Sequence, residues 1–85
     1  MNNKPVTIYT TPTCGYCKLA KEYFKQNGVA FSEVDVAANQ AEARKMIEKS
    51  GQMGVPVITV GEGGDEQIIV GYDRRRLAAA LELPA

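Results

Sequence analysis

Strand-like and helix-like segments alternate along this chain of 85 residues. β-Branched and aromatic residues, which favour strands, are concentrated in residues 6–10, 30–36, 56–60 and 67–70. Apolar residues recur at intervals of three and four in residues 15–26, 40–50 and 74–81, as in amphipathic helices. The predicted order is β-α-β-α-β-β-α, which indicates an α/β fold with a partly parallel sheet and right-handed crossovers. The last two strands predict an antiparallel hairpin with its turn in residues 61–66.

The ends of the predicted helices carry residues suited to capping. Asn39, followed by Glu42, resembles a capping box, and Asp73 is expected to cap the last helix. Gly28 and Gly51 are expected to end the first and second helices. The side chains expected on the apolar faces are Tyr16, Leu19, Ala20, Tyr23 and Phe24, then Ala43, Met46 and Ile47, and finally Leu77, Ala80 and Leu81. The apolar run at 56–60 predicts a strand covered on both faces.

Composition excludes several classes of function. The 10 basic and 10 acidic side chains balance, so the chain lacks the positive excess that neutralises nucleic-acid phosphates. The absence of histidine removes schemes in which histidine activates serine or cysteine, and it removes the commonest metal ligand. No segment approaches the roughly 20 apolar residues of a membrane span. We therefore expect one domain over residues 1–85, with no nucleic-acid and no membrane partner.

The N-terminus bears on the cellular compartment. Its first residues lead directly into a strand-like segment, without the basic and apolar regions of an export signal. The sequence therefore predicts a cytoplasmic protein. In that compartment, paired cysteines are more often catalytic or metal-binding than structural.

Cys14 and Cys17 lie where the first predicted strand passes into the first helix. A zinc site would need two further ligands, but the chain has no other cysteine and no histidine, so no metal site is predicted. A covalent haem site would need histidine at position 18, which is Lys18. Two readings remain, a redox-active pair and two buried thiols packed as small apolar groups. The placement of both cysteines at one helix start favours the redox pair.

The two thiols are expected to have different roles. Unpaired N–H groups at a helix N-terminus stabilise negative charge, which favours a thiolate at Cys14. Cys17 lies one turn inside the helix, so we expect Cys14 to attack a disulfide and Cys17 to resolve the mixed disulfide that results. Lys18 and Lys21 either add positive charge near the thiolate or lie on a solvated helix face. Tyr16 either lines a substrate groove, which is the favoured interpretation, or packs against the protein.

Three segments together resemble the glutaredoxin family. They are residues 11–18 (Thr-Pro-Thr-Cys-Gly-Tyr-Cys-Lys), 54–56 (Gly-Val-Pro) and 70–73 (Val-Gly-Tyr-Asp), in the family's order and spacing. The resemblance covers nearly the whole chain. It implies a thioredoxin-like fold with a four-stranded mixed sheet and three helices. It also implies a monomeric enzyme that reduces protein disulfides and glutathione mixed disulfides with glutathione as co-substrate, acting on disulfide-containing or glutathionylated proteins.

The same resemblance implies further site residues. Pro56 corresponds to a cis-proline that faces the cysteine pair, and Val55 before it offers its backbone N–H and C=O to the substrate. Gly71, Tyr72 and Asp73 correspond to the segment that holds the γ-glutamyl end of glutathione. A helix N-terminus with an aspartate suits that group, which carries one carboxylate and one ammonium.

The chain departs from the family pattern at several positions. The family usually has Lys or Arg where this chain has Thr11, and a Gly-Gly pair where it has only Gly71. Both departures concern the binding of glutathione, and they leave open a redoxin that takes electrons from thioredoxin reductase. Gly15 replaces the commoner proline between the cysteines. This replacement leaves open a carrier of a 2Fe-2S cluster, held by a glutathione-ligated dimer.

Three consecutive arginines, Arg74, Arg75 and Arg76, begin the last predicted helix. Cations in the first turn of a helix oppose its macrodipole. Such a run is usually solvated surface. At this position it would also supply the positive charge missing at Thr11 and attract glutathione carboxylates or an acidic partner.

Overall fold

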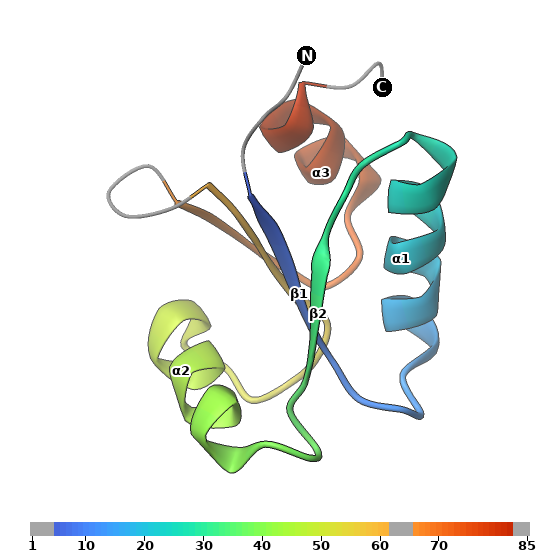
Figure 1. Cartoon of the computed structure of the whole chain (residues 1–85). Helices are drawn as coiled ribbons and strands as arrows, with labels where there is room; N and C mark the ends of the chain where they lie inside the picture. The colour runs from blue at the N-terminus through green and yellow to red at the C-terminus, as the bar shows by residue number, and fades with distance from the viewer. Residues whose placement is uncertain (1–4, 62–65, 83–85) are drawn as a thin grey trace.

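The computed structural model describes residues 5–61 and 66–82, and its elements follow the predicted order (Figure 1). The elements are β1 (Val6–Thr10), α1 (Gly15–Gln26), β2 (Ser32–Asp35), α2 (Gln40–Ser50), β3 (Val57–Val60), β4 (Gln67–Val70) and α3 (Arg74–Leu81). Two strands are shorter than predicted, since β2 does not include residues 30, 31 and 36 and β3 does not include residue 56. The N-terminal residues 1–4 and the centre of the predicted hairpin turn, residues 62–65, lie outside the described residues.

The four strands form one mixed sheet in the order β2-β1-β3-β4. β1 is parallel to β2 and antiparallel to β3, and β3 is antiparallel to β4, which confirms the predicted final hairpin. Among the described strands, only the β1–β2 connection through α1 joins parallel neighbours. The segment that contains α2 leads instead to β3, which lies on the other side of β1 and is antiparallel to it.

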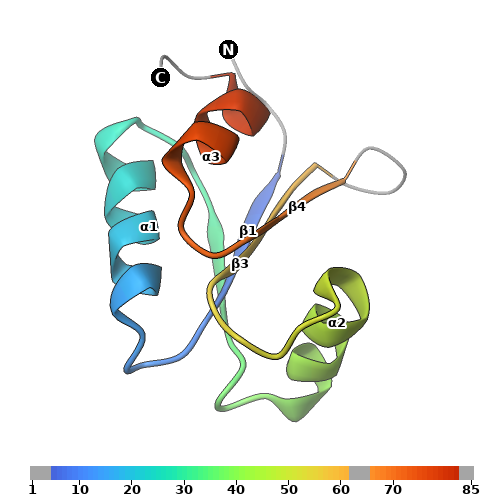
Figure 2. The same ribbon diagram turned by 180° about the vertical axis from the view of Figure 1, so that it is seen from behind.

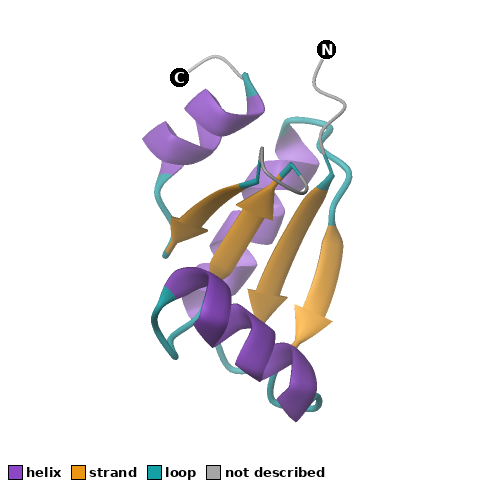
Figure 3. Cartoon of the chain, turned by 90° about the vertical axis from the view of Figure 1, so that its left-hand side faces the viewer, coloured by secondary structure: helices purple, strands orange, loops and turns teal. Residues whose placement is uncertain are grey.

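Helices cover both faces of the sheet. α1 and α3 pack on one face and α2 packs on the other (Figures 2 and 3). Successive residues of a strand point to opposite faces, so Ile8 and Ile58 join the core beneath α1 and α3, whereas Tyr9 and Val57 pack with Met46 of α2. All residues of β3 are buried, as the continuous apolar run predicted.

The apolar face of α1 differs from the predicted one. Its buried side chains are Cys17, Ala20, Tyr23 and Phe24, whereas Tyr16 is 65% exposed and Leu19 is 50% exposed. A helix on a sheet buries only one stripe, and including Cys17 in that stripe rotates Tyr16 and Leu19 away from the sheet. For the same reason Ile47 of α2, predicted to face the core, lies at the edge of the buried stripe around Met46.

The predicted caps are present at the helix ends. The Asn39 side chain accepts the N–H of Glu42 at 3.2 Å, and the Asp73 side chain accepts the N–H of Arg76 at 3.2 Å. Gly51 ends α2 in the left-handed conformation, with φ of 75°, where a side chain would be strained. None of the described helices has both the length and the apolar character that crossing a bilayer requires.

Candidate active site

The segments predicted to form the site meet at one edge of the sheet. Tyr9, near the end of β1, pairs with Val57 at the start of β3, and Val57 pairs with Val70 at the end of β4. The chain leaving β1, the chain entering β3 and the chain leaving β4 therefore lie next to one another. Those three segments carry the cysteine pair, Val55–Pro56 and residues 71–73.

A backbone hydrogen bond joins two of these segments. The N–H of Gly71 donates to the carbonyl oxygen of Pro56 at 2.8 Å, directly beyond the last paired residues of β3 and β4. The Val55–Pro56 peptide bond is cis, as the family resemblance implied. Gly71 has φ of 82°, a conformation that favours glycine, so a larger residue there would be strained. This contact fixes the segment at residues 71–73 beside the proline loop.

Cys14 is the N-cap residue of α1. Its Sγ accepts the N–H of Cys17 at 3.1 Å, and its own N–H donates to the carbonyl oxygen of Thr11 at 3.3 Å. The side chain is half-buried, and the first turn of α1 contains no acidic residue. The sulfur therefore lies at the positive end of the helix dipole, on a residue that is partly exposed to solvent.

Cys17 has a different environment from Cys14, although both are free thiols. Only 1% of its surface is exposed. Burial, followed by the hydrogen bond with Cys14, raises the pKa of the Cys17 thiol to about 12, against smaller opposing effects of Thr11 and Lys21. Cys17 therefore keeps its proton at neutral pH. The structure thus pairs a partly exposed cysteine at a helix N-terminus with a buried, protonated one.

Lys21 of α1 takes part in a polar network with Glu33 of β2 and Thr10 of β1. Glu33 Oε2 accepts hydrogen bonds from Lys21 Nζ at 2.8 Å and from the hydroxyl of buried Thr10 at 2.8 Å. The bond from Lys21, followed by that from Thr10, lowers the pKa of Glu33 below its usual value. Lys21 follows Cys17 by one helical turn, so its ammonium group is held near that thiol. The sequence suggested Lys21 but not its partners, because their meeting depends on the pairing of β1 with β2.

The remaining predicted site residues differ in their exposure. Pro56 is buried, and Val55, Gly71, Tyr72 and Asp73 are partly exposed. The Tyr72 ring packs edge-on against Tyr23 of α1, with 6.4 Å between ring centroids. Tyr16, two residues after Cys14, is exposed to solvent and does not form part of the core.

Within residues 5–61 and 66–82, no group of three or more His, Cys, Asp and Glu side chains is arranged as a metal site. A shared 2Fe-2S cluster would take one cysteine from each of two subunits and further ligands from glutathione. That alternative stays a prediction.

The chain belongs to the glutaredoxin family, whose sequence model matches residues 6–63. It is 40% identical over 77 residues to a glutaredoxin-like 8.6 kDa protein of the rubredoxin operon of Clostridium pasteurianum, covering 91% of this chain and 97% of that one. It is 41% identical over 68 residues to glutaredoxin 3 of Escherichia coli strain K12, covering 80% of this chain and 77% of that protein.

Solved structures confirm the thioredoxin-like fold. The crystal structure of a glutaredoxin from Archaeoglobus fulgidus superposes with a TM-score of 0.79 at 25% identity, covering 92% of this chain and 86% of that one. The NrdH-redoxin of Escherichia coli, described as a glutaredoxin-like protein with a thioredoxin-like activity profile, superposes with a TM-score of 0.72 at 25% identity. That match covers 95% of this chain and 97% of the redoxin.

Proposed function

We propose that this protein is a glutathione-dependent thiol–disulfide oxidoreductase of the cytoplasm, monomeric, with Cys14 as nucleophile and Cys17 as resolving thiol. The observation that supports this most directly is the asymmetry of the two sulfurs. Cys14 is partly exposed and its Sγ accepts an N–H at the start of α1, whereas Cys17 is buried and protonated. Membership of the glutaredoxin family supports the same chemistry.

In the route that uses one thiol, the Cys14 thiolate attacks the glutathione sulfur of a mixed disulfide. A disulfide between Cys14 and glutathione forms, and the substrate leaves as a thiolate that takes up a proton. A second glutathione, as its thiolate, then attacks the bound glutathione sulfur. The products are oxidised glutathione and the regenerated Cys14 thiolate, so two electrons have passed to the substrate.

In the route that uses two thiols, the Cys14 thiolate attacks one sulfur of a protein disulfide and releases the other as a thiolate. Cys17 then transfers its proton to the substrate thiolate released in the first step and attacks Cys14 Sγ, and the second substrate sulfur leaves as a thiolate. The Cys14–Cys17 disulfide that remains is reduced by two glutathione molecules. Burial of Cys17 beside Cys14 suits this role, because it keeps the resolving thiol close to the mixed disulfide and away from other reagents.

The segments from 55 to 56 and from 71 to 73 are proposed to hold glutathione. The backbone of Val55 would pair with its cysteinyl part, and Gly71, Tyr72 and the α3 N-terminus capped by Asp73 would hold its γ-glutamyl part. The bond between Gly71 and Pro56 supports this arrangement, because it keeps the two halves of the proposed groove together.

A second candidate electron source is thioredoxin reductase. Thr11 and the single Gly71 remove features with which the family usually binds glutathione, and one similar structure is a redoxin with a thioredoxin-like activity profile. The two sources are distinguished by NADPH consumption during reduction of one small glutathione mixed disulfide and of one protein disulfide. One reaction contains glutathione with glutathione reductase, and the other contains thioredoxin reductase.

We expect turnover of the mixed disulfide in the glutathione reaction. Turnover of the protein disulfide with thioredoxin reductase alone would assign the second electron source and overturn glutathione dependence. Visible absorbance after anaerobic purification, lost on exposure to air, would support the alternative of a cluster carrier.

A further inference from the structure

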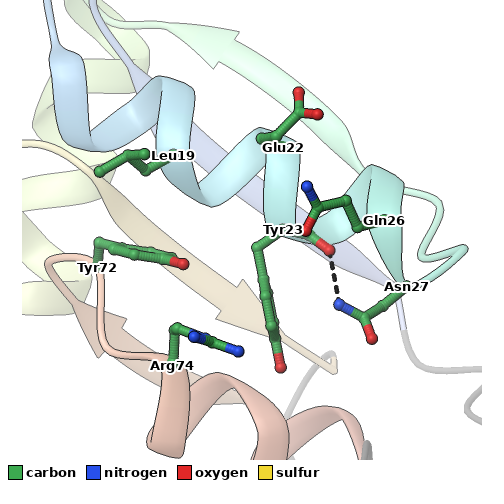
Figure 4. Close-up of a pocket in the computed structure, with 7 residues that line it drawn as sticks. All are labelled: Leu19, Glu22, Tyr23, Gln26, Asn27, Tyr72 and Arg74. Atoms are coloured by element: carbon green, nitrogen blue, oxygen red, sulfur yellow. Dashed lines mark hydrogen bonds between the residues drawn. The ribbon is translucent and has the colours of Figure 1, made fainter.

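An open cleft of about 450 Å³ lies between α1 and α3, on the outer side of the two helices (Figure 4). Leu19, Glu22, Tyr23, Gln26 and Asn27 line it from α1 and its C-terminal cap, and Tyr72 and Arg74 line it from the start of α3. Its volume falls within the usual range for binding pockets. None of these residues except Tyr72 belongs to the proposed glutathione groove.

The cleft begins at that groove and leads away from it. Tyr72 follows Gly71, whose N–H donates to the carbonyl oxygen of Pro56, and Leu19 follows Cys17 by two residues on α1. From Leu19 to Asn27 the helix rises roughly 12 Å. That length accommodates about three or four residues of an extended peptide. A polypeptide whose sulfur is bonded to Cys14 could therefore continue directly into the cleft.

The wall of the cleft is aromatic and carries one cation, Arg74, and one carboxylate, Glu22. Tyr23 and Tyr72 pack edge to face, and the Arg74 guanidinium carbon lies over the Tyr23 ring, 5.7 Å from its centroid. Stacking on the ring holds the guanidinium in place and leaves its N–H groups free to bind an anion. In the described part of the chain, Asp73 pairs with Arg76 and no carboxylate lies within 4.0 Å of Arg74. Figure 4 shows the Glu22 carboxylate pointing away from Arg74.

The far end of the cleft carries side-chain amides. Asn27 Nδ2 donates to the carbonyl oxygen of Tyr23 at 2.9 Å, which orients its Oδ1 as an acceptor for another donor. Gln26 adds a second amide at the same end. Half-exposed Leu19 adds an apolar surface near the groove. This combination of an apolar contact, a cation and amides suits a peptide backbone with an acidic side chain.

We propose that the cleft binds the polypeptide segment flanking the disulfide of a protein substrate, with an Asp or Glu of that segment paired with Arg74. The proposal rests on the proposed oxidoreductase function and adds a preference among its substrates. Arg74 acts here as a specificity residue, because its guanidinium can form two parallel hydrogen bonds with a carboxylate. Leu19 and the two tyrosine rings contact the remainder of the segment.

The test compares two disulfide-closed peptides that differ at one position of a four-residue tail, which is Glu in one and Lys in the other. Two Glu/Lys pairs are made, one with the tail N-terminal to the disulfide and one with the tail C-terminal to it. For every peptide kcat/KM is measured at low ionic strength. The wild type should reduce one of the Glu peptides roughly three- to tenfold faster than its Lys counterpart. Arg74→Ala should lose this preference, and Arg74→Glu should reverse it.

Arg75→Ala is the matched control, because it removes the same charge from the neighbouring position, which does not line the cleft. It should retain the preference. Equal losses in Arg74→Ala and Arg75→Ala would reduce the effect to long-range attraction and overturn the proposal. Absence of any preference in a wild type that reduces both peptides would also overturn it.

Binding measured without turnover separates this proposal from the proposed function. Peptides with serine in place of both cysteines are titrated into the reduced, isotope-labelled protein, and amide chemical shifts are followed. Shifts at Leu19, Tyr23 and Arg74 with the Glu peptide alone would support the cleft even in a protein without oxidoreductase activity. Shifts that are the same for both peptides, or none with either peptide, would overturn it.

Discussion

The N-termini of α1 and α3 use the same hydrogen bond for different purposes. At α1, Cys14 Sγ accepts the N–H three residues ahead at 3.1 Å, and at α3, Asp73 Oδ1 accepts the corresponding N–H at 3.2 Å. The first turn of α1 has no acidic side chain, whereas the first turn of α3 consists of arginines. The capping atom of α1 is the proposed reagent itself. The capping carboxylate of α3 offsets the cations that follow it.

The capping side chains of the two helices therefore differ in how much they stabilise the helix start. Sulfur is a weak hydrogen-bond acceptor, so Cys14 contributes less to holding the start of α1 than an oxygen would. Asp73 is a strong cap, and its carboxylate also faces Arg76, with 3.6 Å between Oδ2 and Nε. We therefore expect substitution of the capping residue of α1 to alter mainly reactivity. Substitution of the capping residue of α3 should alter stability, in addition to any effect on the proposed substrate contacts.

The largest expected effect comes from Cys14→Ser. This substitution should abolish thiol transfer on every disulfide substrate, because serine is not a nucleophile toward sulfur under these conditions. Serine is a preferred N-cap residue, so the free energy of unfolding should stay the same or rise. Turnover of a small mixed disulfide and urea unfolding of the same preparation test the two parts together. Activity equal to that of the wild type would reverse the roles of the cysteines.

Cys17→Ala should have a narrower effect. Reduction of glutathione mixed disulfides should continue, because that route uses only Cys14, whereas reduction of protein disulfides should fall strongly. Alanine avoids placing a hydroxyl group at a position with 1% exposure. Trapping of the substrate as a stable mixed disulfide with Cys14, seen by mass spectrometry, would identify the missing step. Unchanged reduction of protein disulfides would show that Cys17 does not resolve them.

Local sequence was sufficient for the features that lie within one element or at its ends. The bounds of α1 follow from its periodicity and from Asn27–Gly28, and the caps at Asn39 and Asp73 depend on residues only three positions apart. The cysteine pair was recognisable because both thiols occupy one helix start. β2 was less predictable, since this edge strand is half-exposed and its alternation is weak.

Features that need contacts between elements were predicted less well. The cis Val55–Pro56 bond was implied by resemblance to a family and not by the pattern of residues, and the bond between Pro56 and Gly71 was not predicted. The exposure of Leu19 depends on how α1 is rotated against the sheet, and the packing of Tyr23 on Tyr72 depends on where α3 lies. The sequence identifies three arginines, but only the structure distinguishes Arg74, stacked on a tyrosine, from Arg76, paired with Asp73.

The pKa of Cys17 makes the region around α1 sensitive to alkaline pH. Burial raises the pKa of this thiol in the folded protein to about 12, above its ordinary value of 9.0, so the thiol stabilises the fold most below pH 9.0. As pH rises from 9.0 toward about 12, the unfolded chain loses the proton while the folded one keeps it, and stability falls. The loss should be about 1.4 kcal/mol for each unit of pH in that range.

The measurement is urea unfolding of the reduced wild type and of Cys17→Ala at about pH 8 and about pH 10. Other groups titrate over this interval, so the quantity of interest is the change in the difference between the two proteins. The wild type should lose stability relative to Cys17→Ala as pH rises. A difference that is independent of pH would mean that Cys17 ionises in the folded protein as readily as in the unfolded chain.

The smallest expected effect concerns the cap of α3. Asp73→Ala should lower the free energy of unfolding by about 1 kcal/mol, because it removes the hydrogen bond to the N–H of Arg76 and leaves the cations of the first turn without a nearby carboxylate. Asp73→Asn separates these two causes, since asparagine caps nearly as well but carries no charge. The Asp73→Asn variant should retain most of the wild-type free energy of unfolding at high salt. It should lose part of that free energy at low salt, where repulsion among the arginines is least screened. Urea unfolding of both variants at two ionic strengths measures this. Equal destabilisation by Ala and Asn, independent of salt, would show that neither the cap bond nor the charge accounts for the role of Asp73, and the proposed contrast between the two helix starts would fail.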